Sequence, residues 1–229
     1  MVTVNSKVSR SWLLMNPSRE ASLEAAIAST NADEVILDLE DAVAPNEKEP
    51  ARGRVLEYLN SGGNAWVRVN DASSDFWSAD CRALADARGL KGVVLAKTEG
   101  GNHMWDTSNR LGGETPVIAL IETARGLSRV HDIAAARPCF RIAFGVNDYT
   151  LDIGVDRMGM TGKLALRSSD ADTINTGLSP SDEDVSWAQD FVDRFNSQGG
   201  KPKDGSDLPR LNRARIILER ARMLGLITP

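Results

Sequence analysis

The chain has 229 residues, of which 41% are hydrophobic and 26% are charged, and its formal net charge is −5. This length suits one domain of barrel size or two small ones, and the acidic balance without a dense Lys/Arg run excludes a nucleic-acid-binding surface. No apolar stretch reaches membrane-spanning length and no signal-peptide hydrophobic region is present, so we expect a cytoplasmic protein with no membrane partner.

Short apolar runs typical of buried strands recur along the chain, at residues 11–15, 34–38, 65–69, 92–97, 116–122, 141–145 and 163–166. Helix-type segments lie between most of them, at 19–30, 48–60, 75–88, 103–111 and 125–136. Strand starts roughly 22 to 30 residues apart have the pitch of a βα unit. Repeated units of this kind predict a parallel sheet, and their number favours a closed (β/α)8 TIM barrel over an open doubly wound sheet.

The βα pattern breaks between Asp148 and Lys163, where the sequence is rich in glycine and too short for a crossover helix. Seven strands are predicted rather than eight. The barrel is therefore either incomplete, lacking about one βα unit after residue 156, or part of the natural chain is absent. We assign the barrel to residues 1–180 and a C-terminal helical extension to residues 181–229.

The C-terminal extension begins with a helix-start pattern, Ser-Pro-Ser-Asp-Glu-Asp, in which Ser181 is the expected N-cap. The first helix is expected at about 182–195. A polar linker at 197–205 separates it from a last amphipathic helix at about 209–224, whose apolar stripe would pack on its own barrel or on a neighbouring subunit.

Acidic residues cluster where the predicted strands end. Asp38, Glu40 and Asp41 follow the second strand, while Glu122 and Asp148 end the fifth and sixth. The carboxyl ends of barrel strands carry the chemistry of such folds, so Glu122 and Asp148 can converge on one ion. Carboxylates without nearby His or Cys suit Mg²⁺, or Mn²⁺ as a second choice. Alternatively, these acids cap helices or pair with arginines on a solvated rim.

Basic and amide groups also gather at the strand ends. Arg68 and Asn70 end the third strand and Lys97 the fourth, while Arg10 precedes the first strand and could reach the same opening. A guanidinium is suited to bidentate binding of a substrate carboxylate. Lys97 would meet a phosphate or carboxylate, or serve as a simple ion-pair partner.

Five stretches in this order resemble the citrate lyase β-subunit-like family, which includes citryl-CoA and malyl-CoA lyases and belongs with the HpcH/HpaI-type aldolases. The stretches are Arg-Ser-Trp-Leu (10–13), Val-Ile-Leu-Asp-Leu-Glu-Asp-Ala-Val (35–43) followed by Pro45, Lys48, Ala51 and Arg52, Val-Arg-Val-Asn (67–70), Ala-Leu-Ile-Glu-Thr-Ala-Arg-Gly-Leu (119–127) and Phe-Gly with the following Asp (144–148). Asp-Gly-Ser-Asp-Leu-Pro at 204–209 also looks like the Asp-x-Pro that precedes the family's last helix.

The resemblance implies a (β/α)8 barrel, a Mg²⁺ site, CoA-thioester and organic-acid substrates, and a homotrimer. By the match, Glu122 and Asp148 look like the metal ligands and Arg68 like the clamp for a substrate carboxylate. The acids Asp38, Glu40 and Asp41 look like those around the metal-bound waters and the thioester. Asp207 looks like the acid that the C-terminal segment delivers to a neighbouring subunit.

Two departures from the family pattern concern the last part of the barrel. The family's segment between the sixth and last strands is missing after about Asp156. Where relatives usually read Ile-His-Pro-x-Gln after the last strand, this chain has Leu-Arg-Ser-Ser-Asp at 166–170.

These observations lead to one main hypothesis and two alternatives. The main hypothesis is a Mg²⁺-dependent carbon–carbon lyase that acts on a 3-hydroxyacyl-CoA, with Glu122 and Asp148 on the metal, Arg68 on the distal carboxylate and Asp207 as the acid. The first alternative is a metal-dependent aldolase on a free 2-oxo acid. The second is a non-catalytic CoA-thioester-binding protein.

Overall fold

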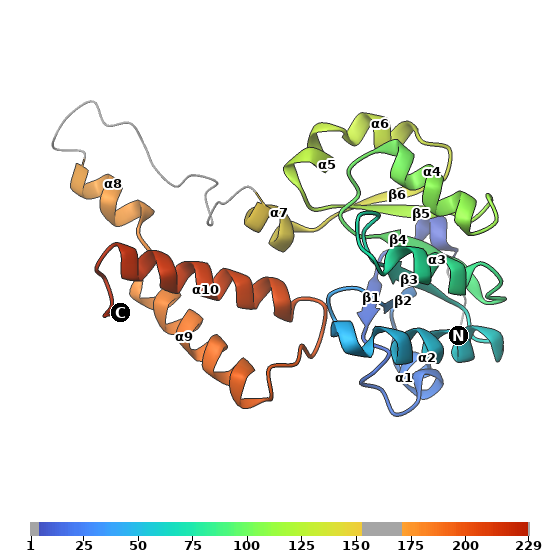
Figure 1. The fold of residues 1–229 in the computed structure, drawn as a ribbon, viewed down its shortest axis with the longest axis horizontal. Coiled ribbons are helices and arrows are strands. Elements are labelled where there is room, and N and C mark those ends of the chain that lie inside the picture. The colour runs from blue at the N-terminus through green and yellow to red at the C-terminus, as the bar shows by residue number, and fades with distance from the viewer. Residues whose placement is uncertain (1–4, 153–170, 229) are drawn as a thin grey trace.

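The computed structural model describes residues 5–152 and 171–228, which form an α/β body and a projecting helical hairpin (Figure 1). The sheet has the strand order β1-β2-β3-β4-β5-β6, and each neighbouring pair is parallel. The strands are β1 (Trp12–Met15), β2 (Glu34–Asp38), β3 (Ala65–Val69), β4 (Leu90–Leu95), β5 (Val117–Ile121) and β6 (Cys139–Phe144). The α/β prediction is confirmed.

Helices connect the strands in the alternating order that the sequence predicted. In the α/β body they are α1 (Leu23–Ser29), α2 (Lys48–Asn60), α3 (Trp77–Leu84), α4 (Gly101–Arg110), α5 (Ala124–Ser128), α6 (Val130–Ala135) and α7 (Val146–Asp152), with short 3-10 turns η1 (Ser6–Val8) and η2 (Pro45–Glu47). The C-terminal part contains α8 (Ala171–Leu178), α9 (Asp182–Ser197) and α10 (Asp207–Met223).

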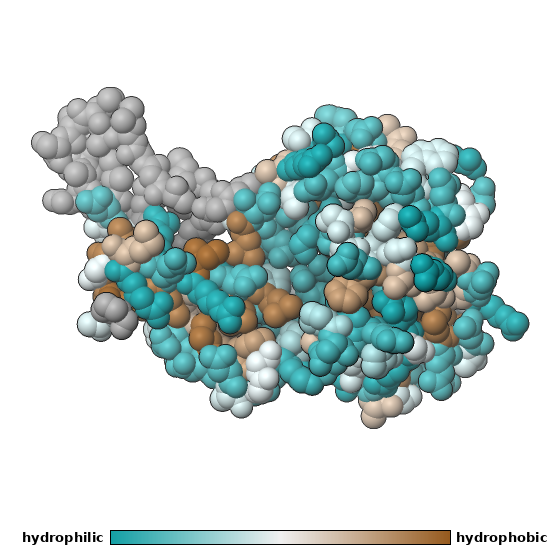
Figure 2. Space-filling model, viewed as in Figure 1, coloured by the Kyte–Doolittle hydropathy of each residue, from teal (hydrophilic) through white to brown (hydrophobic). Residues whose placement is uncertain are grey.

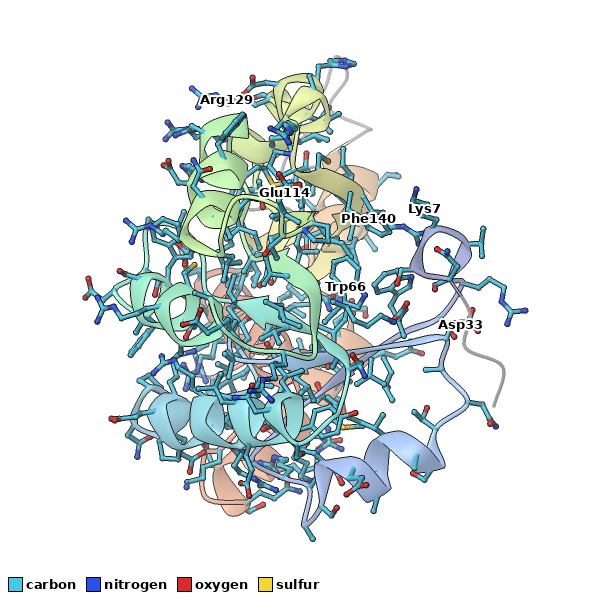
Figure 3. The ribbon with its side chains drawn as sticks, turned by 90° about the vertical axis from the view of Figure 1, so that its right-hand side faces the viewer. Lys7, Asp33, Trp66, Glu114, Arg129 and Phe140 are labelled. Atoms are coloured by element: carbon cyan, nitrogen blue, oxygen red, sulfur yellow. The ribbon has the colours of Figure 1, made fainter. Side chains whose placement is uncertain are left out.

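The sheet is buried on both faces in its middle, which explains its uninterrupted apolar strands. On the helix-covered face, Leu37, Val67 and Val93 pack with helix residues such as Leu59 in the main core. On the concave face, Trp66 of β3 packs against Phe140 of β6 with ring centroids 5.2 Å apart and the ring planes tilted by 39° (Figure 3). All five residues of β3 are buried.

The described residues form a curled, six-stranded half-barrel, whereas we expected a (β/α)8 TIM barrel with seven strands, incomplete after about residue 156. A closed barrel needs strands between β6 and β1, and the predicted strand at 163–166 lies outside the described residues. Arg141 of β6 instead reaches the segment before β1, donating to the carbonyls of Ser9 (3.1 Å), Ser6 (3.2 Å) and Lys7 (3.3 Å). We call these three hydrogen bonds the edge contact, because they join the last strand of the sheet to the segment that precedes the first strand.

The helical hairpin of α9 and α10 has a small hydrophobic core of its own, which includes Phe191, Phe195 and Leu218. The predicted N-cap is confirmed, since the Ser181 hydroxyl accepts a hydrogen bond from the Asp184 N–H at 3.1 Å in a capping box. Helix α10 packs on α9 and touches α7 of the same chain. Hydrophobic residues also lie at the surface of this hairpin (Figure 2).

No helix within residues 5–152 and 171–228 combines the length and the apolar character that a membrane crossing requires.

Candidate functional site

The carboxyl ends of the strands bring together six of the predicted site residues: Asp38, Glu40, Arg68, Lys97, Glu122 and Asp148. We call this edge of the sheet the mouth. The residues come from neighbouring parallel strands or the turns that follow them, so the topology alone places them side by side. Hydrogen bonds and ion pairs link them into one connected group.

Asp38 organises the turn that follows β2. Its Oδ1 accepts from Arg68 Nε (2.7 Å) and the Glu40 N–H (2.9 Å), and its Oδ2 accepts from Arg68 Nη2 (2.6 Å) and the Ala42 N–H (3.1 Å). The side chain is fully buried. Four donors occupy the acceptor sites of the carboxylate, so Asp38 fixes the turn and the guanidinium rather than facing open space.

Glu40 joins the two cations of the mouth. Its Oε2 lies 3.1 Å from Arg68 Nη1, and its Oε1 lies 2.6 Å from Lys97 Nζ. Burial alone would raise the pKa of Glu40, but the charges of Arg68 and Lys97 lower it to about 2. Burial likewise opposes the charge on Lys97, yet Glu40 and Asp41 raise the pKa of that ammonium group above its ordinary value. All three groups therefore carry their charge at neutral pH.

Lys97 has a positive backbone φ of 44°, which is unusual for a residue with a side chain. In this conformation its N–H donates to Glu122 Oε1 at 2.9 Å while its ammonium group pairs with Glu40. Such a backbone costs on the order of 1 kcal/mol and is typical of functional sites. One residue thus connects the β2 turn to the acid after β5.

Glu122 and Asp148 converge as the sequence predicted. Burial, together with the charges of Glu40 and Asp148, raises the pKa of Glu122 to about 8. Burial also raises the pKa of Asp148, and Glu122 is close enough to act on that pKa in the opposite direction. Gly145 permits this arrangement, because a Cβ at that position would overlap the Glu122 carboxyl group.

The pair of Glu122 and Asp148 fits a hard divalent cation. Glu122 is buried and Asp148 is half-buried beside it, and neighbouring carboxyl groups resist ionising together unless a positive charge lies between them. Within the described ranges, no group of three or more His, Cys, Asp or Glu side chains is arranged to hold a metal ion. A cation here would have few protein ligands and would take its other oxygens from water and substrate, which is typical of Mg²⁺.

Asp41 is a further acid at the mouth. Burial raises its pKa to about 7, with a contribution from the neighbouring charge of Glu40. Its surroundings include Lys97 and Asp148. A carboxyl group with this pKa can exchange a proton near neutral pH.

Asn70 was predicted to bind substrate, but its hydrogen bonds are directed into the protein. Its Nδ2 donates to the Leu39 carbonyl (2.9 Å) and to Asp80 Oδ2 (2.6 Å), and its Oδ1 accepts from Lys48 Nζ (2.8 Å). Only 4% of Asn70 is exposed. The sequence analysis included Lys48 in the family resemblance without a role and did not single out Asp80. The helical spacing of Lys48, Val55 and Leu59 could have revealed that Lys48 is buried, since all three lie on the buried face of α2.

Arg10 does not reach the mouth, and this expectation is corrected. It precedes β1, and its guanidinium pairs with Asp33, which precedes β2, through Nε–Oδ2 and Nη2–Oδ1 contacts of 2.9 Å each. Both residues therefore lie at the amino ends of their parallel strands. The mouth is at the opposite end.

The linker of residues 201–206 lies against the mouth of its own chain. Lys201 pairs with Glu47, and the Pro202 carbonyl accepts a hydrogen bond from Arg19. A Cβ at Gly205 would overlap Arg68 Nη2 and come within 3.0 Å of Asp38 Oδ2, so the linker backbone packs directly on this ion pair.

Asp207 follows the 201–206 linker at the start of α10, and its carboxylate accepts from the Lys203 N–H at 2.5 Å. Delivery of Asp207 to a neighbouring subunit stays a prediction.

Comparison with known proteins identifies the family of this chain. The family model described as HpcH/HpaI aldolase/citrate lyase matches residues 11–175, and the HpcH/HpaI aldolase C-terminal domain matches residues 183–225. The chain is 29% identical over 167 residues to an L-malyl-CoA/beta-methylmalyl-CoA lyase of Cereibacter sphaeroides, covering 65% of this chain and 52% of that protein. It is 34% identical over 143 residues to a citrate lyase subunit beta-like protein of Mycobacterium tuberculosis, covering 62% and 50%.

A similar solved structure is the citrate lyase beta subunit of Mycobacterium tuberculosis complexed with oxaloacetate and magnesium. It has a TM-score of 0.57 and 26% identity, and the match covers 91% of this chain and 97% of that one. By sequence, the chain spans about half the length of the curated relatives that it matches. The two family models together cover most of the sequence, and the chain belongs to the HpcH/HpaI aldolase/citrate lyase family.

Proposed function

We propose that the protein is a Mg²⁺-dependent carbon–carbon lyase that cleaves a 3-hydroxyacyl-CoA such as malyl-CoA or citryl-CoA. The observation that carries this proposal is the convergence of buried Glu122 and half-buried Asp148 at the carboxyl ends of β5 and β6, where partial or full burial raises the pKa of both carboxyl groups. The relatives support the substrate class, since one is named a malyl-CoA lyase and a similar structure contains magnesium with oxaloacetate.

The reaction is a retro-Claisen cleavage. The substrate hydroxyl loses its proton, the bond between the carbinol carbon and the carbon next to the thioester breaks, and an oxo acid leaves. The thioester enolate then takes up a proton to give the acyl-CoA. The protein must therefore stabilise an alkoxide, hold a carboxylate and supply one proton.

Glu122 and Asp148 would hold the metal ion. When bound, Mg²⁺ would stabilise the negative charge that develops on the substrate hydroxyl oxygen. Glu122 is held in place for this role because its Oε1 accepts the Lys97 N–H. Any proton that the raised pKa values keep on Glu122 or Asp148 must leave before the two groups bind a cation.

The cations of the mouth would bind the substrate carboxylate. The Lys97 side chain is 35% exposed although it pairs with Glu40. The Arg68 side chain is almost entirely buried between Asp38 and Glu40. Substrate would meet Lys97 first and reach the remaining N–H groups of Arg68 where the 201–206 linker lies. Asp207 of a partner chain in a trimer is our candidate for the acid that protonates the enolate.

The test combines metal binding with turnover. Glu122→Gln and Asp148→Asn should each abolish the heat of Mg²⁺ binding in calorimetry and the Mg²⁺-dependent release of acetyl-CoA from malyl-CoA or citryl-CoA. Glu114→Gln is the matched control, since Glu114 is 87% exposed and pairs with Arg137, which is also exposed. Undiminished turnover in either site variant would disprove the assignment.

One alternative has an observation in its favour. Oxaloacetate in the related structure is a free 2-oxo acid, as an aldolase without CoA would use. Cleavage of free 4-hydroxy-2-oxo acids but not of the thioesters would identify that activity. Affinity for a CoA thioester without any turnover would identify a non-catalytic binding protein.

A further inference from the structure

A buried polar network supports the mouth from the helix-covered side of the sheet. Lys48 Nζ donates to the carbonyls of Leu39 (2.8 Å) and Glu40 (3.1 Å) and to Asn70 Oδ1 (2.8 Å). Asn70 in turn donates to Asp80 Oδ2, through its backbone N–H at 3.1 Å and its Nδ2 at 2.6 Å. We call Lys48, Asn70, Asp80 and Arg52 the support network.

Arg52 completes the network at its outer end. Its Nε and Nη2 donate to Asp80 Oδ1 at 3.0 and 2.8 Å. Asp80 is 1% exposed and Asn70 is 4% exposed. Each member is satisfied by the next, so the network can resist displacement as a unit.

The position of Lys48 is costly and its contacts are specific. It is the first residue of α2, where a cation faces the positive end of the helix dipole, and burial lowers the pKa of its ammonium group. All three ammonium protons are used, and the ring of Phe76 lies 5.1 Å away. Two of its acceptors are consecutive carbonyls in the turn that carries Glu40 and Asp41.

The orientation of that turn determines where its acids point. Asp38 fixes the turn through the N–H groups of Glu40 and Ala42, and Lys48 fixes the carbonyl groups on its other side. With both sides held, the Glu40 carboxylate can bridge Arg68 and Lys97. A turn held on one side alone would leave these charges free to rearrange.

We infer that Lys48, braced by Asn70, Asp80 and Arg52, is a positioning residue that acts on the mouth through Glu40. It contacts no reacting group and lies on a helix outside the sheet. This inference deepens the proposed lyase function, on which its kinetic readout depends.

A double-mutant cycle tests the inference. Lys48→Met should lower kcat/KM by about tenfold or more, and Glu40→Gln should also lower it. Because Lys48 acts through Glu40, the double variant should be little worse than Glu40→Gln alone. Lys91→Met is the control, since it removes a partly buried lysine paired with Glu34 at the amino end of the strands. Its effect should be small and additive with Glu40→Gln.

A second readout needs no substrate. Lys48→Met should accelerate amide hydrogen exchange within residues 39–43, where Leu39 donates to the Arg68 carbonyl at 2.9 Å and Val43 to the Glu40 carbonyl at 3.0 Å. Lys91→Met should leave this segment unchanged. If the protein shows no lyase activity, only the proposed function fails, and the exchange experiment still decides the role of Lys48.

The inference would be overturned by full additivity in the cycle, or by unchanged exchange of residues 39–43 in Lys48→Met. Should Lys48→Met fail to fold, Asp80→Asn replaces it. That variant loosens Asn70 while retaining the bonds from Lys48 to the turn, and should show the same non-additivity and faster exchange at reduced size. Additive kinetics with unchanged exchange in Asp80→Asn would equally overturn it.

Discussion

Replacing Asp38 by Asn tests whether one buried carboxylate holds the mouth together. The carboxylate accepts four hydrogen bonds, two from Arg68 and one each from the N–H groups of Glu40 and Ala42. In either orientation, the amide nitrogen of Asn would face two of these donors and leave them unpaired. The guanidinium would also lose the carboxylate that chiefly balances its charge, and Arg68 is only 5% exposed.

Breaking one partner of a buried ion pair costs about 3–5 kcal/mol. In a protein of this size, each kcal/mol lowers Tm by about 2–4 °C, so Asp38→Asn should melt roughly 6–20 °C lower. Urea unfolding should show a lower midpoint with an unchanged slope. Glu114→Gln makes the same chemical change in an exposed pair and should cost less than about 1 kcal/mol. If Asp38→Asn falls within about 1 kcal/mol of this control, the four-donor account of Asp38 is refuted.

Three further predictions follow from other groups of the mouth. Without Mg²⁺, the free energy of unfolding should fall as pH rises from about 5 to about 8, because Glu122 with its pKa of about 8 keeps a proton in that window that the unfolded chain has lost. Glu122→Gln should reduce the slope of this pH profile without abolishing it, because the raised pKa of Asp41, about 7, acts in the same direction, and an unchanged slope would contradict the reasoning. Gly205→Ala should displace the 201–206 linker from Arg68 and accelerate cleavage of this linker by trypsin several-fold. Gly177→Ala is the control, because a Cβ there meets open space, and it should leave the cleavage rate unchanged. Equal cleavage rates in the two variants would argue against close packing of the linker on Arg68. Lys97→Gly should be more stable than Lys97→Ala by about 1 kcal/mol, because glycine accepts a φ of 44° without strain, and the opposite order in urea unfolding would exclude that strain.

Much of the fold could be predicted from the sequence, because buried strands and helix starts have local patterns. The strands at 34–38 and 65–69 and the helix at 48–60 are confirmed with the predicted bounds. The fourth strand was placed at 92–97 but ends at Leu95, since Lys97 leaves the extended conformation in a way that hydrophobicity does not encode. The single helix expected at 125–136 is two, because Arg129 (φ −111°, ψ 14°) interrupts it.

The convergence of Glu122 and Asp148 could be predicted for a topological reason, since the carboxyl ends of adjacent parallel strands must meet. The hydrogen-bond partners of Asp38 and Asn70 could not. They depend on which backbone N–H and carbonyl groups a six-residue turn presents, and no spacing rule supplies that information. Sequence reasoning therefore located the mouth but could not distinguish the acid that faces a ligand from the acid that holds a turn.

The edge contact of Arg141 has a mechanical consequence for the mouth. Three hydrogen bonds to the carbonyls of Ser6, Lys7 and Ser9 tie β6 to the segment before β1 at the amino ends of the strands. The six strands are hydrogen-bonded side by side, so their curvature at one end is transmitted to the other. The edge contact therefore limits how far β6 and the segment before β1 can move apart. Because the acceptors are backbone carbonyls, side-chain substitutions at residues 6–9 leave them in place, and replacement of Arg141 is the change that would release this edge without altering any residue of the mouth.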